Sequence, residues 1–485
     1  MKIRWSTFIV AGMLLAGCTS VPDKLHSPTL ADRVPLAGLP AHAGAEWPDA
    51  RWWRRYDDPQ LDQLIDMALK GSTSLAEARS RVQQAAQAAR VTAAKSGLNI
   101  NASAQLSRQR MSEHGLIPTK FLGFTWYNQG DLGISLDYDF DWWGKHQATV
   151  ESAIGKTRAA QAQRSAAVLA LETAVTRTWF DWLTDRARLD LASQRVAVQQ
   201  KLLDITKLRA HAGLISSDNI QQAQSMLSGA LQQQTVFAGS AAIHRAILAA
   251  LVGVAPAQLP TLKAHPLPQL HAGLPADAGL DLIARRPDIA ASRWQVESAL
   301  RDTDVARAQF LPDISIRALA GLSSIDLGKL LDAGSRTFAL TPAIHLPIFE
   351  GGLLRANYGF SKATLQAAIA QYNATVVNAA RDVATKVLTL EGLRLQRRQQ
   401  AHQIKAAQQL HVNAASRQKQ GLTSAEPALQ AQNRLLLQRD AGVVLHGQAL
   451  TADVGLIGAL GGGYRSAPAD AADASSSPSH PDDSP

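Results

Sequence analysis

The side chains that could do chemistry in this sequence are one cysteine, scattered carboxylates and thirteen histidines. No Ser, His and Asp set can be assigned to nucleophilic catalysis, and no histidine has metal-ligand spacing to a cysteine or an acid. The sequence also has no Gly-rich phosphate loop followed by Lys and Ser or Thr. We therefore expect a protein that is not an enzyme, with no metal and no bound cofactor, whose histidines mostly face solvent.

The single cysteine, Cys18, follows Leu-Ala-Gly at positions 15–17. A positive start (Lys2, Arg4) and an apolar stretch over residues 8–16 precede it, and that stretch is too short to span a bilayer. A lone cysteine excludes an internal disulfide, and a small buried apolar residue is the alternative interpretation.

Residues 15–18 resemble the lipobox of bacterial lipoproteins, in which the cysteine is lipidated and becomes the mature N-terminus. The resemblance implies that residues 1–17 are a signal peptide and that Cys18 carries a covalent lipid. Thr19, in place of Asp, implies sorting to the outer membrane. Residues 18–50 contain five prolines and predict an extended tether, whereas residues 466–485 have the composition of a disordered tail.

The region between them is an internal duplication of helix, strand pair, long helix and shorter helix. Gly144 and Gly352 lie 208 residues apart, and so do Gly213 and Gly421. We expect a first repeat over 51–254, a Pro-rich connector over 255–275 and a second repeat over 276–465.

Two segments of each repeat alternate apolar and polar residues, which predicts β-hairpins over 98–143 and 313–350. Each run has about 9–11 residues, the length of a tilted transmembrane strand. The tips would lie near 108–129 and 321–335. An ordinary sheet packed on a core is the alternative, but three carboxylates on one strand favour a water-filled barrel lumen: Asp137, Asp139 and Asp141. One face of each strand would consist of Leu98, Ile100, Ala102, Ala104 and Leu106; Leu132, Ile134, Leu136, Tyr138, Phe140 and Trp142; Ile314, Ile316, Ala318 and Ala320; and Phe338, Leu340, Pro342, Ile344, Leu346 and Ile348.

Four strands cannot close a barrel, and open strand edges are not tolerated in lipid. The chain must therefore share its strands with other copies, and three copies would supply twelve strands. A diffusion porin is disfavoured because porins have about sixteen strands per chain and few long helices.

Residues 145–212 contain no proline and predict a helix of about 100 Å. Leu189, Val196 and Leu203 recur at heptad spacing, while Ala192 and Gln199 form a more polar row. Such polar seams favour a hollow helical barrel. A periplasmic coiled-coil scaffold lipoprotein without a channel is the alternative. The formal charge of +9 is scattered and does not indicate nucleic-acid binding.

Several motifs together resemble the TolC-type outer-membrane factor family, and particularly its lipidated branch of efflux outer-membrane subunits. The similarity covers residues 47–465. It rests on Trp52-Trp53 with Asp58-Pro59 and Leu61; on 282–289, 306–312, 346–352 and 381–383; and, for the subgroup tied to multidrug and fusaric-acid resistance, on Trp142-Trp143-Gly144, Arg293-Trp294, 378–384 and 460–464.

This resemblance implies an α+β membrane protein that forms a homotrimer in the outer membrane and contacts outer-membrane lipid. A twelve-stranded transmembrane barrel would continue into a periplasmic α-helical barrel with a mixed α/β equatorial region. The trimer would be a passive exit duct for drugs or toxic small molecules. A periplasmic adaptor would connect it to an inner-membrane pump that supplies the energy.

In that family the two helix-turn-helix elements form the periplasmic tip, which here corresponds to the turns at Gly213 and Gly421. Asp218 and Glu426 occupy equivalent places and are candidates for a periplasmic constriction. They could equally be first-turn acids favoured by the helix dipole. Pro427 departs from the family's pattern at the second turn. Ser and Thr residues after each glycine could cap the next helix: Ser216, Ser217, Thr423 and Ser424.

By contrast, Arg285 to Asp288, with Pro287 at a first helical position, has the pattern of an ordinary helix start.

Overall fold

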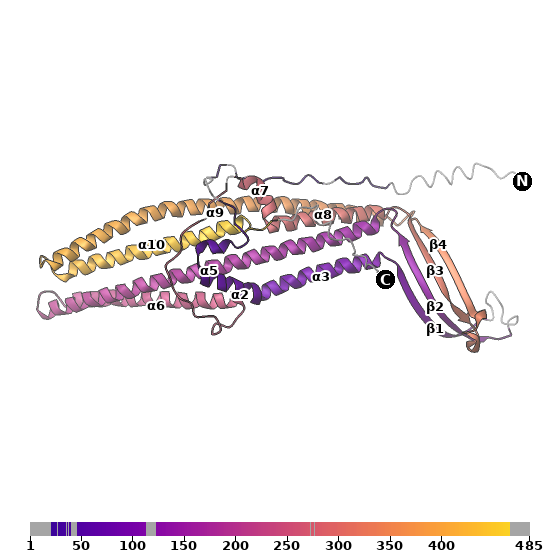
Figure 1. Cartoon of the computed structure of the whole chain (residues 1–485), viewed down its shortest axis with the longest axis horizontal. Helices are drawn as coiled ribbons and strands as arrows, with labels where there is room; N and C mark the ends of the chain where they lie inside the picture. Colours follow the sequence, from indigo (N-terminus) through magenta and orange to yellow (C-terminus); the bar gives the residue numbers. More distant parts are fainter. Residues whose placement is uncertain are drawn as a thin grey trace, which may run out of the picture. The chain divides into compact units, whose positions relative to one another are not determined.

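The computed structural model describes residues 21–26, 28–34, 36, 38–39, 46–112, 123–271, 273–275 and 277–465. The signal segment, Cys18 and the tail over 466–485 lie outside these residues. The described chain is mostly helical with one sheet (Figure 1). Its elements are η1 (Trp52–Tyr56), α2 (Pro59–Gly71), α3 (Thr73–Lys95), β1 (Asn99–Arg110), β2 (Trp126–Phe140), α5 (Lys145–His211), α6 (Asp218–Val252), α7 (Ala278–Arg285), α8 (Pro287–Ala308), β3 (Asp313–Ser324), η2 (Leu327–Lys329), η3 (Ala333–Ser335), β4 (Arg336–His345), α9 (Leu353–Lys419) and α10 (Ala425–Ala459).

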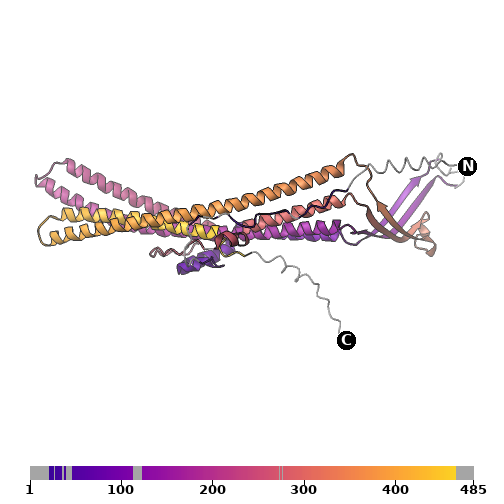
Figure 2. The same ribbon diagram turned by 90° about the horizontal axis from the view of Figure 1, so that it is seen from above.

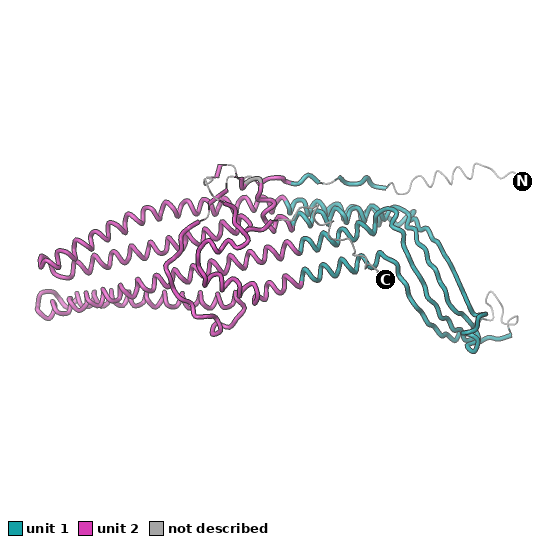
Figure 3. The backbone as a smooth tube through the Cα atoms, in the orientation of Figure 1, with its two compact units in different colours: residues 1–30, 81–160, 292–372 teal, residues 31–80, 161–291, 373–485 magenta. Residues whose placement is uncertain are grey.

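The chain divides into two compact units, each built from both halves of the sequence (Figure 3). The first contains residues 81–160 and 292–372, together with residues 1–30. The second contains 31–80, 161–291 and 373–485. A compact unit is therefore not one sequence repeat, because each repeat contributes segments to both units.

The first unit carries a four-stranded antiparallel sheet in the order β1-β2-β3-β4. The register pairs residues of like character: Ala102 opposes Ile134, and Ala318 opposes Leu340. The same holds between the two hairpins, where Asp137 opposes Arg317. Because successive side chains point to opposite faces, the sheet has one apolar and one polar face, as the alternating pattern predicts.

The strand ends differ from those expected. β1 continues to Arg110 and β2 begins at Trp126, so both extend into the segment predicted as a loop tip. β3 likewise reaches Ser324. Backbone pairing persists here after the strict alternation of side chains has ended. Conversely, four residues predicted within strands lie beyond their ends: Leu98, Trp142, Leu346 and Ile348.

The second unit has a conventional packed core where η1 and α2 contact the central part of α5. Trp52 is 1% exposed, and Trp179 and Phe180 are fully buried. Tyr56 packs edge-on against Phe180 at a centroid distance of 4.9 Å. Because these four aromatic side chains are buried here, this part of the chain is stabilised by its own residues.

The end of α2 approaches the end of α6 closely. A Cβ added at Gly253 would lie 2.3 Å from the Gly71 carbonyl oxygen, and φ at Gly253 is +83°. Both the contact and the left-handed backbone require glycine at this position.

The helices of the two repeats match in length. α5 and α9 each contain 67 residues, and α6 and α10 each contain 35. Near the turns that join them, α6 lies beside α5 and α10 lies beside α9 (Figures 1 and 2). Gln234 donates to Ser193 within the first pair, and Gln400 donates to Gln438 within the second.

Candidate functional site

The polar face of the sheet contains most of its charged groups. Arg317 on β3 donates to the Asp137 carboxylate on the facing position of β2. Asp139 lies on the same face, two residues further along β2. Near the other end of this strand, Asp131 accepts from Ser323 at 2.6 Å. Two of the predicted lumen residues, Asp137 and Asp139, thus lie near Arg317, which was not among the residues predicted from the sequence.

Asp141 has a different role. It lies one residue past the end of β2, and its carboxylate accepts from the backbone amides of His146 and Gln147 at 2.9 and 2.8 Å. These amides belong to the first turn of α5, which has no earlier helical carbonyls to bind. The expectation that Asp141 continues the strand pattern is therefore wrong. Its carboxylate caps the long helix.

The opposite face of the sheet is apolar and open. Phe338, Leu340 and Ile344 on β4 are 75%, 69% and 74% exposed. β1 and β4 have only one strand neighbour each within the described residues, so each leaves one edge of backbone N–H and C=O groups unpaired. Long exposed apolar strands with free edges are unstable in water. Within the described residues, nothing covers this face or pairs with these edges.

The turns at Gly213 and Gly421 are built identically. Both glycines have φ of +71°, the left-handed conformation that ends many helices. The next residues, Leu214 and Leu422, donate their amides to the carbonyls of Arg209 and Arg417 at 2.9 Å. The predicted helix breaks are therefore confirmed at these glycines.

The predicted capping by hydroxyl groups is wrong. Ser217 and Ser424 precede α6 and α10, and neither side chain forms a cap hydrogen bond within the described residues. Ser217 has helical backbone angles, which point its hydroxyl away from the amides that a cap would bind. Ser216 instead accepts from the side chain of Asn219 at 3.2 Å.

The two predicted constriction acids differ in their surroundings. Glu426 forms an ion pair with Arg209 of α5, 217 residues earlier in the chain, and accepts from Gln430. Asp218 is the first residue of α6 and is exposed. The structure thus joins the two tip hairpins through Arg209, a residue that no sequence motif indicated.

A buried polar cluster fastens the connector to the core of the second unit. Asp58 is 6% exposed, and its carboxylate accepts from Trp179 Nε1 and lies 2.9 Å from His265 Nε2. Asp58 also accepts from the amides that begin α2. His265 and His244 are exceptions to the expectation that histidines mostly face solvent, since both are partly buried and His244 Nδ1 lies 2.7 Å from Asp185.

Glu172 lies in the same core. Burial raises the pKa of Glu172 to about 7, although a hydrogen bond from the Trp52 indole lowers it. Desolvation disfavours the charged carboxylate. Glu172 belongs to α5 and contacts Trp52 of η1 in the packed core, which indicates a structural group.

The Arg285–Asp288 segment is structural as well. Pro287 is the first residue of α8, as expected. The buried Arg286 donates to the carbonyl of Ala459 at the end of α10 and forms ion pairs with Asp288 and Asp382. It therefore joins three helices of the second unit.

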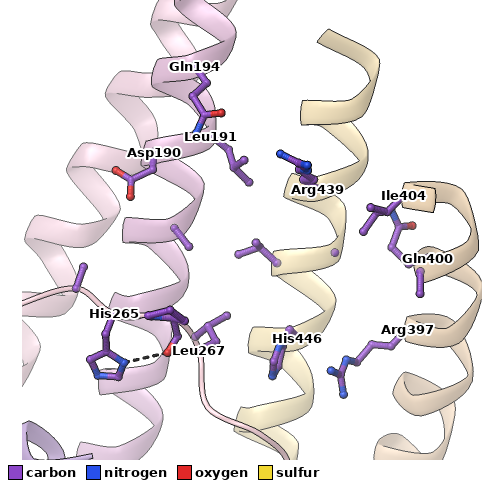
Figure 4. A pocket seen from close by; sticks show the side chains of 16 residues that line it. Asp190, Leu191, Gln194, His265, Leu267, Arg397, Gln400, Ile404, Arg439 and His446 are labelled. Atoms are coloured by element: carbon purple, nitrogen blue, oxygen red, sulfur yellow. Dashed lines mark hydrogen bonds between the residues drawn. The ribbon is translucent and has the colours of Figure 1, made fainter. Parts of the chain in front are cut away.

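A cavity of about 760 Å³ lies among α5, α9, α10 and the connector in the second unit. Figure 4 shows Arg397, Arg439 and His446 around it, with Leu191, Leu267 and Ile404 among its apolar side chains. No group of three or more His, Cys, Asp or Glu side chains that could hold a metal occurs among the described residues. The remaining lining residues are Ala187, Asp190, Gln194, Ala264, His265, Pro266, Gln400, Ala401, Gly442 and Val443.

Comparison with known proteins relates this architecture to efflux. A model of the outer membrane efflux protein family matches residues 64–254 and 280–462. The multidrug resistance outer membrane protein MdtP of Escherichia coli (strain K12) is 33% identical over 474 residues, which cover 96% of each chain. MdtQ of Escherichia coli O157:H7, with the same description, is 33% identical over 465 residues, or 93% of this chain and 96% of its own.

Among solved structures, the outer membrane protein VceC of Vibrio cholerae superposes with a TM-score of 0.78 at 31% identity. The alignment covers 86% of this chain and 100% of VceC. The family match falls on both halves of the sequence, and the two relatives align over nearly their whole length. The chain therefore belongs to the outer membrane efflux protein family.

Proposed function

We propose that three copies of this chain form the passive exit duct of a tripartite efflux system in the outer membrane. An inner-membrane pump would supply the energy, and a periplasmic adaptor would join the two. The observation that carries the proposal is the sheet, with one apolar face, one polar face and two free edges.

The sheet explains why copies must associate. A four-stranded sheet with free edges is not stable in lipid, where each unpaired backbone group costs several kcal/mol. Pairing β4 of one copy with β1 of the next would remove every edge, and three copies would close a barrel of twelve strands. The apolar face would then contact lipid, and Asp137, Asp139 and Arg317 would line the water-filled lumen.

The long helices support the second part of the duct. α6 is long and apolar enough to cross a bilayer by length and composition. We propose instead that its apolar residues pack against a neighbouring copy in a helical tunnel, because α6 is paired with α5 by polar contacts such as His244 with Asp185. Five large side chains on α6 are exposed in the single chain: Met226, Leu231, Val236, Ile243 and Ile247.

Planar-bilayer recording tests the duct against the coiled-coil scaffold. Purified full-length protein should form discrete ion-conducting channels, and it should migrate as a heat-sensitive trimer in gels. A scaffold lipoprotein would produce neither conductance nor heat-modifiable migration, and that result would replace the duct with the scaffold.

The turns at Gly213 and Gly421 are the proposed periplasmic mouth. Three copies would place rings of Asp218 and Glu426 there, and each Arg209–Glu426 pair would hold two hairpins together. Replacing both acids with Ala should raise single-channel conductance, because loss of Glu426 breaks the ion pair that holds the two hairpins together. It should also reduce the block by divalent cations, because a ring of negative charge attracts cations. Asp66→Ala, an exposed acid on α2, is the control. Unchanged conductance and cation block in the double variant would remove both acids from the mouth.

The lipid anchor on Cys18 is part of the proposal. It rests on the resemblance of residues 15–18 to the lipobox. Cells that express the wild-type chain should incorporate labelled palmitate into it, whereas Cys18→Ser should abolish the labelling. A normally labelled variant would contradict the anchor.

A further inference from the structure

The cavity of about 760 Å³ in the second unit has the size and lining of a small-molecule site. Such sites measure about 300–1,000 Å³, with mostly apolar walls and a few oriented polar groups. Here the wall is formed by Leu191, Leu267, Ile404 and Val443. Its polar groups come from different helices, which fixes their spacing.

The charges around the cavity are unbalanced. Arg397 of α9 and Arg439 of α10 both line it, whereas Asp190 is the only acid in the lining. In Figure 4 the Asp190 carboxylate points away from both arginines, while the Arg397 guanidinium extends towards His446. The described residues place no carboxylate within ion-pair distance of Arg397. Arg439 is held by a hydrogen bond to Gln408 at 2.8 Å.

The surroundings of Arg397 raise the cost of leaving it unpaired. Burial lowers the pKa of its guanidinium, and the neighbouring Arg394 lowers it further. Burial also lowers the pKa of His446, and the charge of Arg397 acts in the same direction. A contact of 2.8 Å between His446 Nε2 and the Pro268 carbonyl partly opposes this effect. The neutral imidazole is therefore favoured, and Arg397 is the cation available to a ligand.

We propose that this cavity binds a small amphipathic organic anion, whose ring system contacts the apolar wall and whose carboxylate pairs with Arg397. An aromatic or alicyclic monocarboxylate has this chemistry. An inorganic anion would leave the apolar wall uncovered, and an organic cation would be repelled by the arginines. The channel proposal does not depend on this site, so a negative result here leaves the channel proposal intact.

Equilibrium dialysis of the full-length protein in lipid nanodiscs tests the site, with empty nanodiscs as the blank. The probes are 2-naphthoate and its neutral counterpart 2-naphthalenemethanol. Naphthoate should bind saturably and about tenfold or more tightly than the alcohol, which is the effect expected of one charge-assisted hydrogen bond. Its affinity should fall as salt is raised, since the pair is only partly buried.

Two variants and one control make the test specific. Arg397→Gln should abolish the preference for the acid and leave the affinity for the alcohol nearly unchanged. Ala401→Trp should weaken both probes by filling the cavity. Lys201→Gln removes a positive charge from an exposed position of α5 and should change neither. Equal affinity of the wild type for both probes, no saturable binding, or an acid preference that survives Arg397→Gln would overturn the proposal.

Discussion

The sheet of the first unit and the aromatic core of the second use apolar residues in opposite ways. In the core, Trp179 and Phe180 are fully buried by their own chain. On the sheet, Phe338 and Ile344 are about three-quarters exposed. Neighbouring strands of the sheet pair in continuous register, so the difference does not arise from poor folding of the sheet.

This difference shows where the chain is complete by itself. Burial of apolar area is the main favourable contribution to folding, and the core obtains it from contacts within one copy. In the proposed duct, the sheet would obtain it from lipid and from neighbouring copies. Substitutions in the two regions should therefore differ in both size and environment dependence.

Trp179→Ala should have the largest effect. Removing a fully buried indole leaves a cavity and costs about 3–5 kcal/mol. It also removes a donor from the buried Asp58. Thermal unfolding in detergent should shift strongly downwards, whereas Phe338→Ala on the sheet should shift it much less. Similar shifts for the two variants would contradict the contrast between core and sheet.

Leu340→Arg should have the next largest effect. On the lipid face of a barrel, an arginine costs about 2–4 kcal/mol near the bilayer centre. The matched substitution is Thr341→Arg, one residue along β4 and on the polar face. The free energy of unfolding in lipid vesicles should decrease for Leu340→Arg and change little for Thr341→Arg. Equal losses would mean that the two faces do not meet different solvents.

Glu172→Gln should have a smaller effect that depends on pH. The ordinary carboxyl pKa is 4.5 and that of Glu172 is about 7. Between these values the folded chain holds a proton that the unfolded chain has released, so stability falls as pH rises through this window. The difference corresponds to roughly 3 kcal/mol at most.

Glutamine carries no charge, so the free energy of unfolding of this variant at pH 8 should exceed that of the wild type by about 1–3 kcal/mol. The variant should therefore melt at a higher temperature than the wild type at this pH. At pH 4, where Glu172 is protonated in both states, the two proteins should melt together. An equal difference at both pH values would assign the effect to packing instead of charge.

Much of this architecture could be predicted from sequence, because it rests on periodic signals. Alternation along β2 and β3 indicated the two faces of the sheet, and Gly213 and Gly421 marked the ends of the long helices. The 208-residue offset linked the two hairpins and the two helical pairs.

The side-chain contacts of the site could not be predicted in the same way. Arg209 meets Glu426, and Asp58 meets His265, across more than 200 residues. Such pairs leave no periodic signal in one sequence. Asp141 was misplaced for a related reason, since its polar character fits both a strand face and a helix cap, and only the strand end decides between them.

The matched helix lengths restrict how this gene can change. One residue inserted within α9 would move everything beyond it by about 1.5 Å along the helix axis and by about 100° around it. Glu426 would then turn away from Arg209 and their ion pair would be lost. An insertion in α9 should therefore need a compensating insertion in α5, which accounts for the common length of these two helices although other segments of the repeats differ in length.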